Sequence, residues 1–220
     1  STMTTTTQMS VVTIYKYCPE RKKFLNQSSD EFALSEIFEA TSVLNVHEDI
    51  VDEAKEEKII RLIDLASTSW SASSQNVRKQ EFGPEIDFCK RSVVDHRVFT
   101  GLPNCVTTLT ATLSKFQSDF RPNRLRILEY SNKIGEEWVD TLFFEHSWVF
   151  TDTMALVALQ CDLTIRFQID ADKQAEIYVP VRSCVIVKGP LSYTRVLVRR
   201  ADSTLTRCLL LVFNELKPEF

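Results

Sequence analysis

The order of its sequence patterns predicts an α+β protein, in which a β-sandwich or jelly roll carries N-terminal helices packed on one side. Two helix-like segments come first, at about 52–65 and 103–117, and short runs rich in Val, Ile, Leu, Phe and Tyr follow from residue 124. In LTIRFQI, residues 163–169, apolar and polar residues alternate, which is the period of a half-buried strand. Helices that precede the strands, instead of alternating with them, favour α+β.

The helices are predicted from capping residues and apolar spacing. Asp52 can cap the helix at 52–65, and Pro103 opens the helix at 103–117. SSDEFALSEIFEA, at 28–40, has Ser or Asp as a cap and apolar residues near helical spacing, so it is predicted to be a third helix. The strands expected after residue 124 are RLRILEY, TMALVALQC, LTIRFQI, AEIYVPV, SCVIVKG, TRVLVRR and TRCLLLVF.

The chain shows no internal repeat and no linker between its helical and strand-rich parts. We therefore expect one domain over 41–220, preceded by an N-terminal extension over 1–40. The extension contains five aromatic residues, which predicts either a binding surface or a contribution to the domain's own core. These are Tyr15, Tyr17, Phe24, Phe32 and Phe38.

Composition excludes several classes of protein. The net charge of −4 excludes a strongly basic nucleic-acid coat, and no apolar run approaches the ~20 residues that span a bilayer. Only four glycines are present, and no phosphate-binding glycine loop can be written. The six cysteines form no C-x-x-C pair, so we interpret them as small buried side chains in a reducing compartment, either cytoplasmic or nuclear.

An ordered set of segments points to a known family. VLNVHEDIVDEAKEEKIIRLID (43–64), VRKQEFG (77–83), PNRLRILEY (122–130), VRSCVIVKGPLSY (181–193) and RCLLLVF (207–213) follow one another at suitable spacing. In this order they resemble segments of the AlkB-like 2-oxoglutarate/Fe(II) dioxygenases, over residues 43–214. The resemblance implies a double-stranded β-helix, a form of jelly roll, with VRKQEFG as its nucleotide-recognition lid.

The resemblance also implies positions for a metal and a co-substrate. The family holds iron with an H-x-D pair and a distal histidine. Here the H-x-D positions carry Phe143-Phe144-Glu145, and the distal position carries Leu197. Of the co-substrate positions, Tyr130 and Arg207 are retained, whereas two others carry Leu128 and Phe213.

The three histidines do not repair this metal site. They are His47, His96 and His146, so no histidine is available in the later strands. His47 and Asp49 spell H-x-D, but they lie in the first strand of the resemblance, and we interpret His47 as a strand-end residue before a helix cap. We predict no metal, no cofactor and no catalytic residue, with Tyr130 and Arg207 as vestigial cofactor-binding positions. We also expect Phe143, Leu197, Phe213 and Leu128 to fill the former polar site with apolar side chains.

These replacements predict a catalytically inactive AlkB-like protein, a pseudoenzyme that acts as a binding or scaffolding subunit. We expect protein partners in a larger assembly, with RNA as a candidate partner and no membrane. The alternatives are a divergent 2-oxoglutarate/Fe(II) dioxygenase with unusual ligands, and a stand-alone nucleic-acid-binding module that uses the lid. The predicted interaction residues are Arg78, Lys79, Gln80 and Phe82, with basic neighbours that include Arg124 and Arg126.

Overall fold

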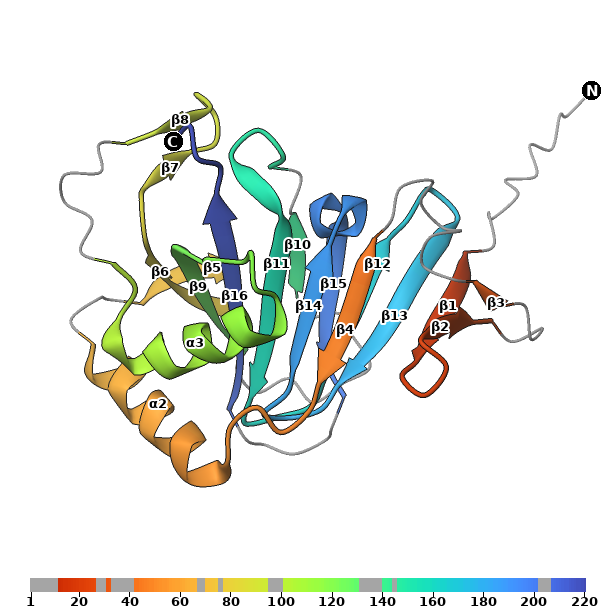
Figure 1. The fold of residues 1–220 in the computed structure, drawn as a ribbon, viewed down its shortest axis with the longest axis horizontal. Helices are drawn as coiled ribbons and strands as arrows, with labels where there is room; N and C mark the ends of the chain where they lie inside the picture. Colours follow the sequence, from red (N-terminus) through yellow and green to blue (C-terminus); the bar gives the residue numbers. More distant parts are fainter. Residues whose placement is uncertain are drawn as a thin grey trace, which may run out of the picture.

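Two seven-stranded sheets and two α-helices make up most of the part of the chain that the structure, a computed structural model, describes (Figure 1). The described residues are 12–26, 31–32, 42–66, 70–74, 77–94, 101–130, 140–143, 146–201 and 207–220, and the side chains of 74 and 140–143 are not among them. Most of the described elements are strands, so the structure is more strongly β than the predicted α+β class.

The first sheet, called the major sheet below, has the order β4-β14-β11-β16-β9-β6-β5. Every neighbouring pair in it is antiparallel. Its strands are β4 (Val43–His47), β5 (Ser71–Ser74), β6 (Val77–Phe82), β9 (Arg124–Tyr130), β11 (Phe150–Leu159), β14 (Cys184–Lys188) and β16 (Cys208–Leu216).

The second sheet, called the minor sheet, has the order β10-β15-β12-β13-β1-β2-β3. The pair formed by β1 and β13 is parallel, and the others are antiparallel. Its strands are β1 (Thr13–Cys18), β2 (Lys23–Leu25), β3 (Glu31–Phe32), β10 (Asp140–Phe143), β12 (Leu163–Gln168), β13 (Lys173–Val179) and β15 (Arg195–Arg200). The seven runs predicted as strands after residue 124 are confirmed as β9 and β11–β16.

Apolar side chains from both sheets form one cluster between them, called the inter-sheet core below. In β12, Leu163, Ile165 and Phe167 are fully buried in this core, as the alternation predicts. Leu128 and Leu210 meet them from the major sheet. β12 therefore commits every second residue to the inter-sheet core.

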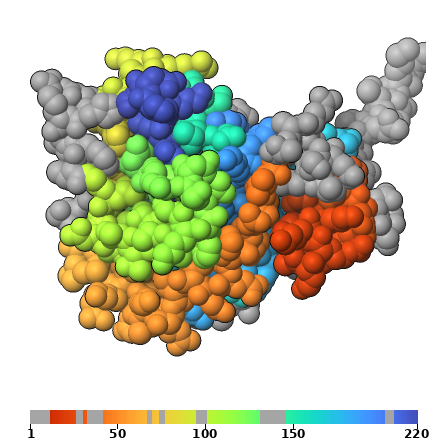
Figure 2. Space-filling view, viewed as in Figure 1, coloured from red at the N-terminus to blue at the C-terminus, as the bar shows by residue number. Residues whose placement is uncertain are grey.

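The other face of the major sheet is covered by two helices, α2 (Glu53–Leu65) and α3 (Thr107–Phe116), the second preceded by the 3-10 turn η2 (Asn104–Val106). Figures 1 and 2 show both helices lying across this side of the molecule. Asp52 caps α2 by accepting a hydrogen bond from the Lys55 amide at 2.7 Å, as its position before the helix predicts. None of the helices in the described ranges has the length and apolar character of a bilayer-spanning segment.

The N-terminal strands complete the minor sheet. Tyr15 and Phe24 are buried in the inter-sheet core, and Tyr17 and Phe32 pack against it. The hypothesis of an exposed aromatic binding surface is therefore wrong for these four residues. They contribute to the domain's own core, which was the alternative prediction. Phe38 lies outside the described residues.

One predicted helix is partly replaced by a strand. Glu31 and Phe32, inside the segment 28–40, form β3, and Phe32 pairs with Phe24 of β2. The pairing buries an aromatic contact between Phe32 and Tyr15, with ring centroids 4.4 Å apart, which local helix spacing does not reveal. The rest of that segment lies outside the described residues. The predicted boundary at residue 40 stays a prediction.

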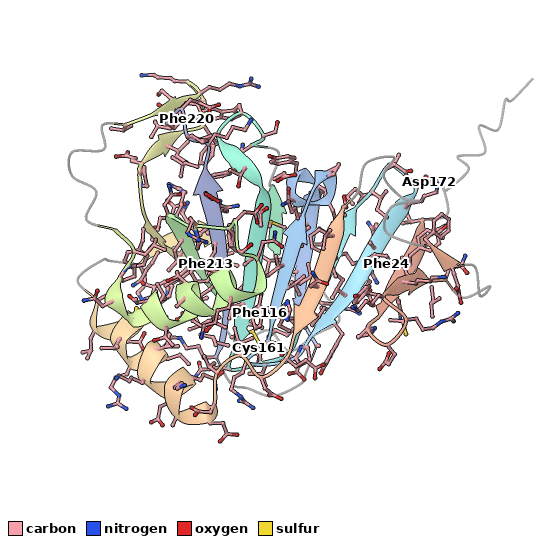
Figure 3. The ribbon with its side chains drawn as sticks, viewed as in Figure 1. Phe24, Phe116, Cys161, Asp172, Phe213 and Phe220 are labelled. Atoms are coloured by element: carbon pink, nitrogen blue, oxygen red, sulfur yellow. A yellow bond between two sulfur atoms is a disulfide. The ribbon has the colours of Figure 1, made fainter. Side chains whose placement is uncertain are left out.

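The cysteines differ from their predicted state. Cys161 and Cys208 form a disulfide, so the interpretation of all six as separate small side chains is wrong for these two. Cys18, Cys89, Cys105 and Cys184 are free. Cys161 lies in the turn between β11 of the major sheet and β12 of the minor sheet, and Cys208 opens β16 of the major sheet, so the bond joins this turn to the start of β16 (Figure 3).

Candidate functional site

The position predicted for the distal metal ligand does not point between the sheets. Val196 and Val198 of β15 are fully buried in the inter-sheet core, whereas Leu197 between them faces the opposite side and is half-buried. Successive side chains of a strand alternate between faces, so a one-residue error in counting moves a residue to the wrong face. The prediction that Leu197 fills the site is wrong, and Val196 and Val198 take that place.

The other predicted filling residues also divide between the two faces of the major sheet. Leu128 lies in the inter-sheet core, as predicted. Phe213 lies in the cluster between the sheet and the helices, where Figure 3 shows it beside α3. Phe143 belongs to β10, but its side chain lies outside the described residues.

The described residues do not fit an iron site. Within the described ranges, no group of three His, Cys, Asp or Glu side chains lies close enough to hold a metal ion. His47 ends β4 and stacks on Phe116, with ring centroids 3.8 Å apart and an angle of 2° between the rings. His146 packs against Phe88, 4.2 Å between centroids. Valine and leucine side chains between the sheets offer no donor atom, and no step through a metal follows from these residues.

Tyr130 and Arg207, the two positions that the resemblance assigned to a co-substrate, have different surroundings. Tyr130 is buried in the inter-sheet core, next to Cys208 in the strand pairing. Arg207 instead donates to Glu129 at 2.6 Å and to both oxygens of Asp64 in α2 at 2.8 Å. Burial lowers the pKa of Arg207, but the two carboxylates raise it by more than burial lowers it, so the pKa of Arg207 lies above its usual value. Arg207 thus ties α2 to the sheet.

The lid segment is a strand within the major sheet, so its predicted interaction residues do not share one surface. Arg78 is half exposed, donates to Glu129 at 2.9 Å and lies 4.8 Å from the ring centroid of Trp70. Gln80 is buried, and Phe82 packs in the helix-side cluster. Lys79 points to the opposite face, with a third of its side chain exposed. The structure therefore does not bring Phe82 and the two cations together.

A group of charged residues gathers on the face of β6 and β9 that continues the inter-sheet side. Lys79, Arg124 and Arg126 all approach one oxygen, Oε1 of Glu81, at 3.7, 3.4 and 3.8 Å. We call these four residues the cation cluster. Directly paired residues of neighbouring strands share a face, and Glu81 pairs directly with Arg126. Lys79 and Arg124 lie two positions from this pair on the same strands, so they point to the same face.

The turn after β6 fixes one member of this cluster. Gly83 has φ +112°, a conformation that glycine adopts without strain, and an added Cβ would lie 2.6 Å from the carbonyl oxygen of Asn123. The close approach places the Pro84 carbonyl oxygen 2.6 Å from the Arg124 guanidinium, which donates to it. Sequence reasoning noted Arg124 and Arg126 as basic neighbours of the lid but did not identify Glu81 as the carboxylate that they share.

An aromatic group adjoins the cation cluster through Arg124. The guanidinium carbon of Arg124 lies 5.9 Å from the ring centroid of Phe88. Phe88 follows β7 (Ile86–Asp87), which pairs with β8 (Ser92–Val93) as a short hairpin. We call the rings around Phe88 the aromatic cluster. It comprises Phe88, His146, Trp148, Phe150 and Phe220.

The two stacked sheets, with helices on one face, define the jelly-roll class, and comparison with solved structures agrees. The structure of OsALKBH1 superposes with a TM-score of 0.53 at 13% identity, covering 80% of this chain and 98% of that one. The two proteins therefore share a fold. A 2OG-Fe(II) oxygenase family oxidoreductase from Burkholderia pseudomallei gives a TM-score of 0.46 at 11% identity, covering 79% of this chain and 82% of that one.

One sequence relative is also found. A DNA N6-methyl adenine demethylase of Caenorhabditis elegans is 29% identical over 91 residues, which are 40% of this chain and 30% of that protein. The match thus spans less than a third of the relative's length. No protein-family model matches the chain.

These findings correct one prediction made from the sequence. The prediction that the chain is not an enzyme is contradicted by a relative that is named a demethylase. The histidines missing from the predicted ligand positions were taken as loss of activity, but a divergent chain can place its reacting groups elsewhere. The apolar replacements therefore describe how the core is packed and do not establish inactivity.

Proposed function

We propose that this chain is a divergent AlkB-like protein of the 2-oxoglutarate oxygenase class that binds nucleic acid. One observation supports this most directly: the cation cluster and the aromatic cluster adjoin through Arg124 and Phe88. Cations contact the phosphates of a nucleic acid, and aromatic rings stack on its bases. The sequence relative, which is named for an activity on DNA, is consistent with such a ligand.

The charge distribution supports a local contact, not a basic coat. The chain carries a net charge of −4, yet three cations share one carboxylate in the cation cluster. A protein of this charge attracts a polyanion only where cations are concentrated. The same region contains Trp148 and Phe220, whose rings meet edge to face with centroids 5.7 Å apart. Phe220 is exposed, so a base has access to it.

Titration of labelled oligonucleotides against salt tests the proposal. Single-stranded DNA, single-stranded RNA and duplex DNA, all without terminal phosphates, are titrated at several salt concentrations. Lys79→Ala should weaken binding and reduce the slope of log K against log salt by about 0.7–0.9, because one phosphate contact is lost. Trp148→Ala should weaken single-strand binding with little change in slope.

Lys16→Ala is the matched control. Lys16 is exposed on β1 of the minor sheet and approaches Glu176 at 3.8 Å. Figure 1 shows β1 at the opposite side of the molecule from β6 and β9, so this variant removes one positive charge far from the cluster. Equal effects of Lys16→Ala and Lys79→Ala, or the absence of any salt-dependent binding by the unmodified protein, would contradict the proposal.

The predicted role as a binding subunit of a larger assembly is a separate proposal. Its support is that the cation cluster and the aromatic cluster adjoin and could together contact a partner protein. A pull-down with the full chain and with the Lys79→Ala variant tests it, and a partner retained equally by both would place that contact outside the cation cluster.

A further inference from the structure

The cation cluster has more donors than its own acceptor can satisfy. All three cationic nitrogens lie 3.4–3.8 Å from the same Glu81 oxygen. Ordinary N–H···O hydrogen bonds measure about 2.7–3.2 Å, so none of the three contacts has the length of a good bond. One carboxylate oxygen therefore serves three cationic groups, and the shortest of the three contacts, from Arg124, is a long hydrogen bond of 3.4 Å.

Arg126 carries the clearest sign of an unmet partner. Its Nε is buried and has no hydrogen-bond acceptor among the described residues. Its side chain is only 17% exposed, so water does not replace that partner freely. A buried donor that lacks an acceptor costs about 1–3 kcal/mol, and more when the group is charged. An incoming acceptor would recover this cost.

The local charge is also unbalanced. Arg124, whose side chain is 6% exposed, and Arg126 are both largely buried, whereas Glu81 is 38% exposed. The pKa of Arg124 is lowered, mainly by burial. The neighbouring charge of Arg126 also lowers this pKa, whereas Glu81 and the exposed Glu85 raise it. Water screens both glutamates better than it screens the arginines, so the buried part of the cluster remains positive.

We infer that Lys79, Arg124 and Arg126 bind a dianionic phosphate group, with Glu81 as the internal group that it displaces. A phosphate monoester carries about −1.5 to −2 charges and three terminal oxygens, so each cation can receive an oxygen of its own. A carboxylate offers two oxygens and one charge, which Glu81 already supplies. Glu81 is exposed enough to turn toward water when the phosphate enters.

Two sources could supply this phosphate: the terminal phosphate of a nucleic acid, or a free nucleotide or inorganic phosphate. Only the first source rests on the proposed nucleic-acid function. Binding of inorganic phosphate and of adenosine 5′-monophosphate is measured by calorimetry with the full chain. Binding of one oligonucleotide sequence is measured with a 5′-phosphate and with a 5′-hydroxyl end.

The decisive variant is Glu81→Gln. If the cluster is a phosphate site, this variant binds phosphate more tightly; if the cluster is only an internal ion-pair network, it does not. Removing the competing carboxylate should tighten phosphate binding several-fold. Arg126→Gln and Lys79→Gln should each weaken it about tenfold, which corresponds to a charge-assisted hydrogen bond. Circular dichroism and thermal unfolding establish that each variant is folded, and Lys79→Gln, at a partly exposed position, serves if Arg126→Gln does not fold.

Glu176→Gln is the matched control. Glu176 also sits between two cations, Lys16 at 3.8 Å and Arg166 at 2.6 Å, but it makes a good bond with one of them. It should leave phosphate binding unchanged. The inference is overturned if phosphate does not bind, or if Glu81→Gln binds no more tightly than the unmodified chain.

The outcomes separate this inference from the proposed function. A 5′-phosphate that strengthens oligonucleotide binding supports both. Phosphate binding without any oligonucleotide binding supports the site and overturns the proposed function. Salt-dependent oligonucleotide binding that ignores the terminal phosphate, together with no binding of free phosphate, leaves the proposed function standing and overturns the site.

Discussion

The two ends of the β9–β16 strand pair differ sharply although they belong to the same face of the same sheet. At one end Tyr130 pairs with Cys208, and both are buried in the inter-sheet core. At the other end Arg124 pairs with Asn214, and both are buried polar residues. We call these the disulfide end and the cation end.

The difference shows that alternation sets the face of a residue but not its surroundings. Residues 124, 126, 128 and 130 point to the same side of β9, yet the first two are arginines and the last two are core residues. The disulfide end is covered by apolar side chains of the minor sheet, such as Leu163. The cation end instead buries Arg124 and Arg126 beside the single carboxylate of Glu81, and it is the end at which we propose that a phosphate binds.

The largest expected effect is loss of the disulfide. Its cysteines are 47 positions apart in the sequence, and in the chain-entropy treatment a loop of this size stabilises a protein by about 4 kcal/mol. We expect the double variant Cys161→Ala, Cys208→Ala to unfold at correspondingly lower urea concentration. Cys89→Ala, at an exposed free cysteine, should have little effect.

A thiol count tests the same bond directly. The denatured, non-reduced chain should expose four thiols, and the reduced chain six. If the denatured chain exposed six thiols without reduction, the disulfide would be absent and this difference between the two ends would not exist.

The next effect concerns apolar packing at the disulfide end. Leu163 is fully buried, so Leu163→Ala should lower the free energy of unfolding by about 3 kcal/mol through lost burial and the cavity left behind. Lys79→Ala at the cation end should cost less than about 0.5 kcal/mol, as surface changes usually do. Similar urea midpoints for both variants would remove the contrast between the ends.

Arg207 should have an intermediate effect, because it joins the disulfide end to α2. Arg207→Ala removes the hydrogen bonds to Glu129 and Asp64 and should destabilise the fold by about 2 kcal/mol, the magnitude of bonds to charged groups. Arg207→Lys should restore only part of this, since lysine lacks the planar fork. Hydrogen exchange should show faster opening of α2. Unchanged exchange would mean that α2 is held by its apolar face alone.

The smallest effect is expected at the Asp119–Lys188 ion pair, which joins the end of the α3 region to β14 at 2.8 Å. The hydrogen bond from Lys188 lowers the pKa of Asp119 to about 2, with help from Gln117. A lowered carboxyl pKa contributes stability above its usual value near 3.8 and loses it as the pH falls toward 2.

Both groups of this pair are exposed and screened, so Asp119→Asn should cost less than about 0.5 kcal/mol at pH 7. The difference between variant and unmodified protein should vanish by about pH 2. Unfolding curves across this range check the sign, and a difference that grows as the pH falls would contradict it.

Sequence reasoning predicted the strands after residue 124 but placed Leu197 on the wrong face of its strand, and the reason is physical. Runs such as 163–169 show their own period, so β12 and its buried side chains could be predicted locally. Leu197 was placed by counting from Gly189 and Tyr193, which flank and end the turn η3 (Pro190–Tyr193), and not from the period of β15 itself. A shift of one residue exchanges the two faces of a strand.

The sequence by itself determined the apolar periodicity, the helix cap at Asp52 and the scarcity of histidine, because these depend on neighbouring residues or on composition alone. The tertiary structure decided the disulfide, the pairing of Phe32 with Phe24 and the meeting of Lys79, Arg124 and Arg126 at Glu81. Each of these joins residues from different strands or turns. Their contact depends on strand register and sheet order, which are set by burial across the whole core and not by any local run of residues.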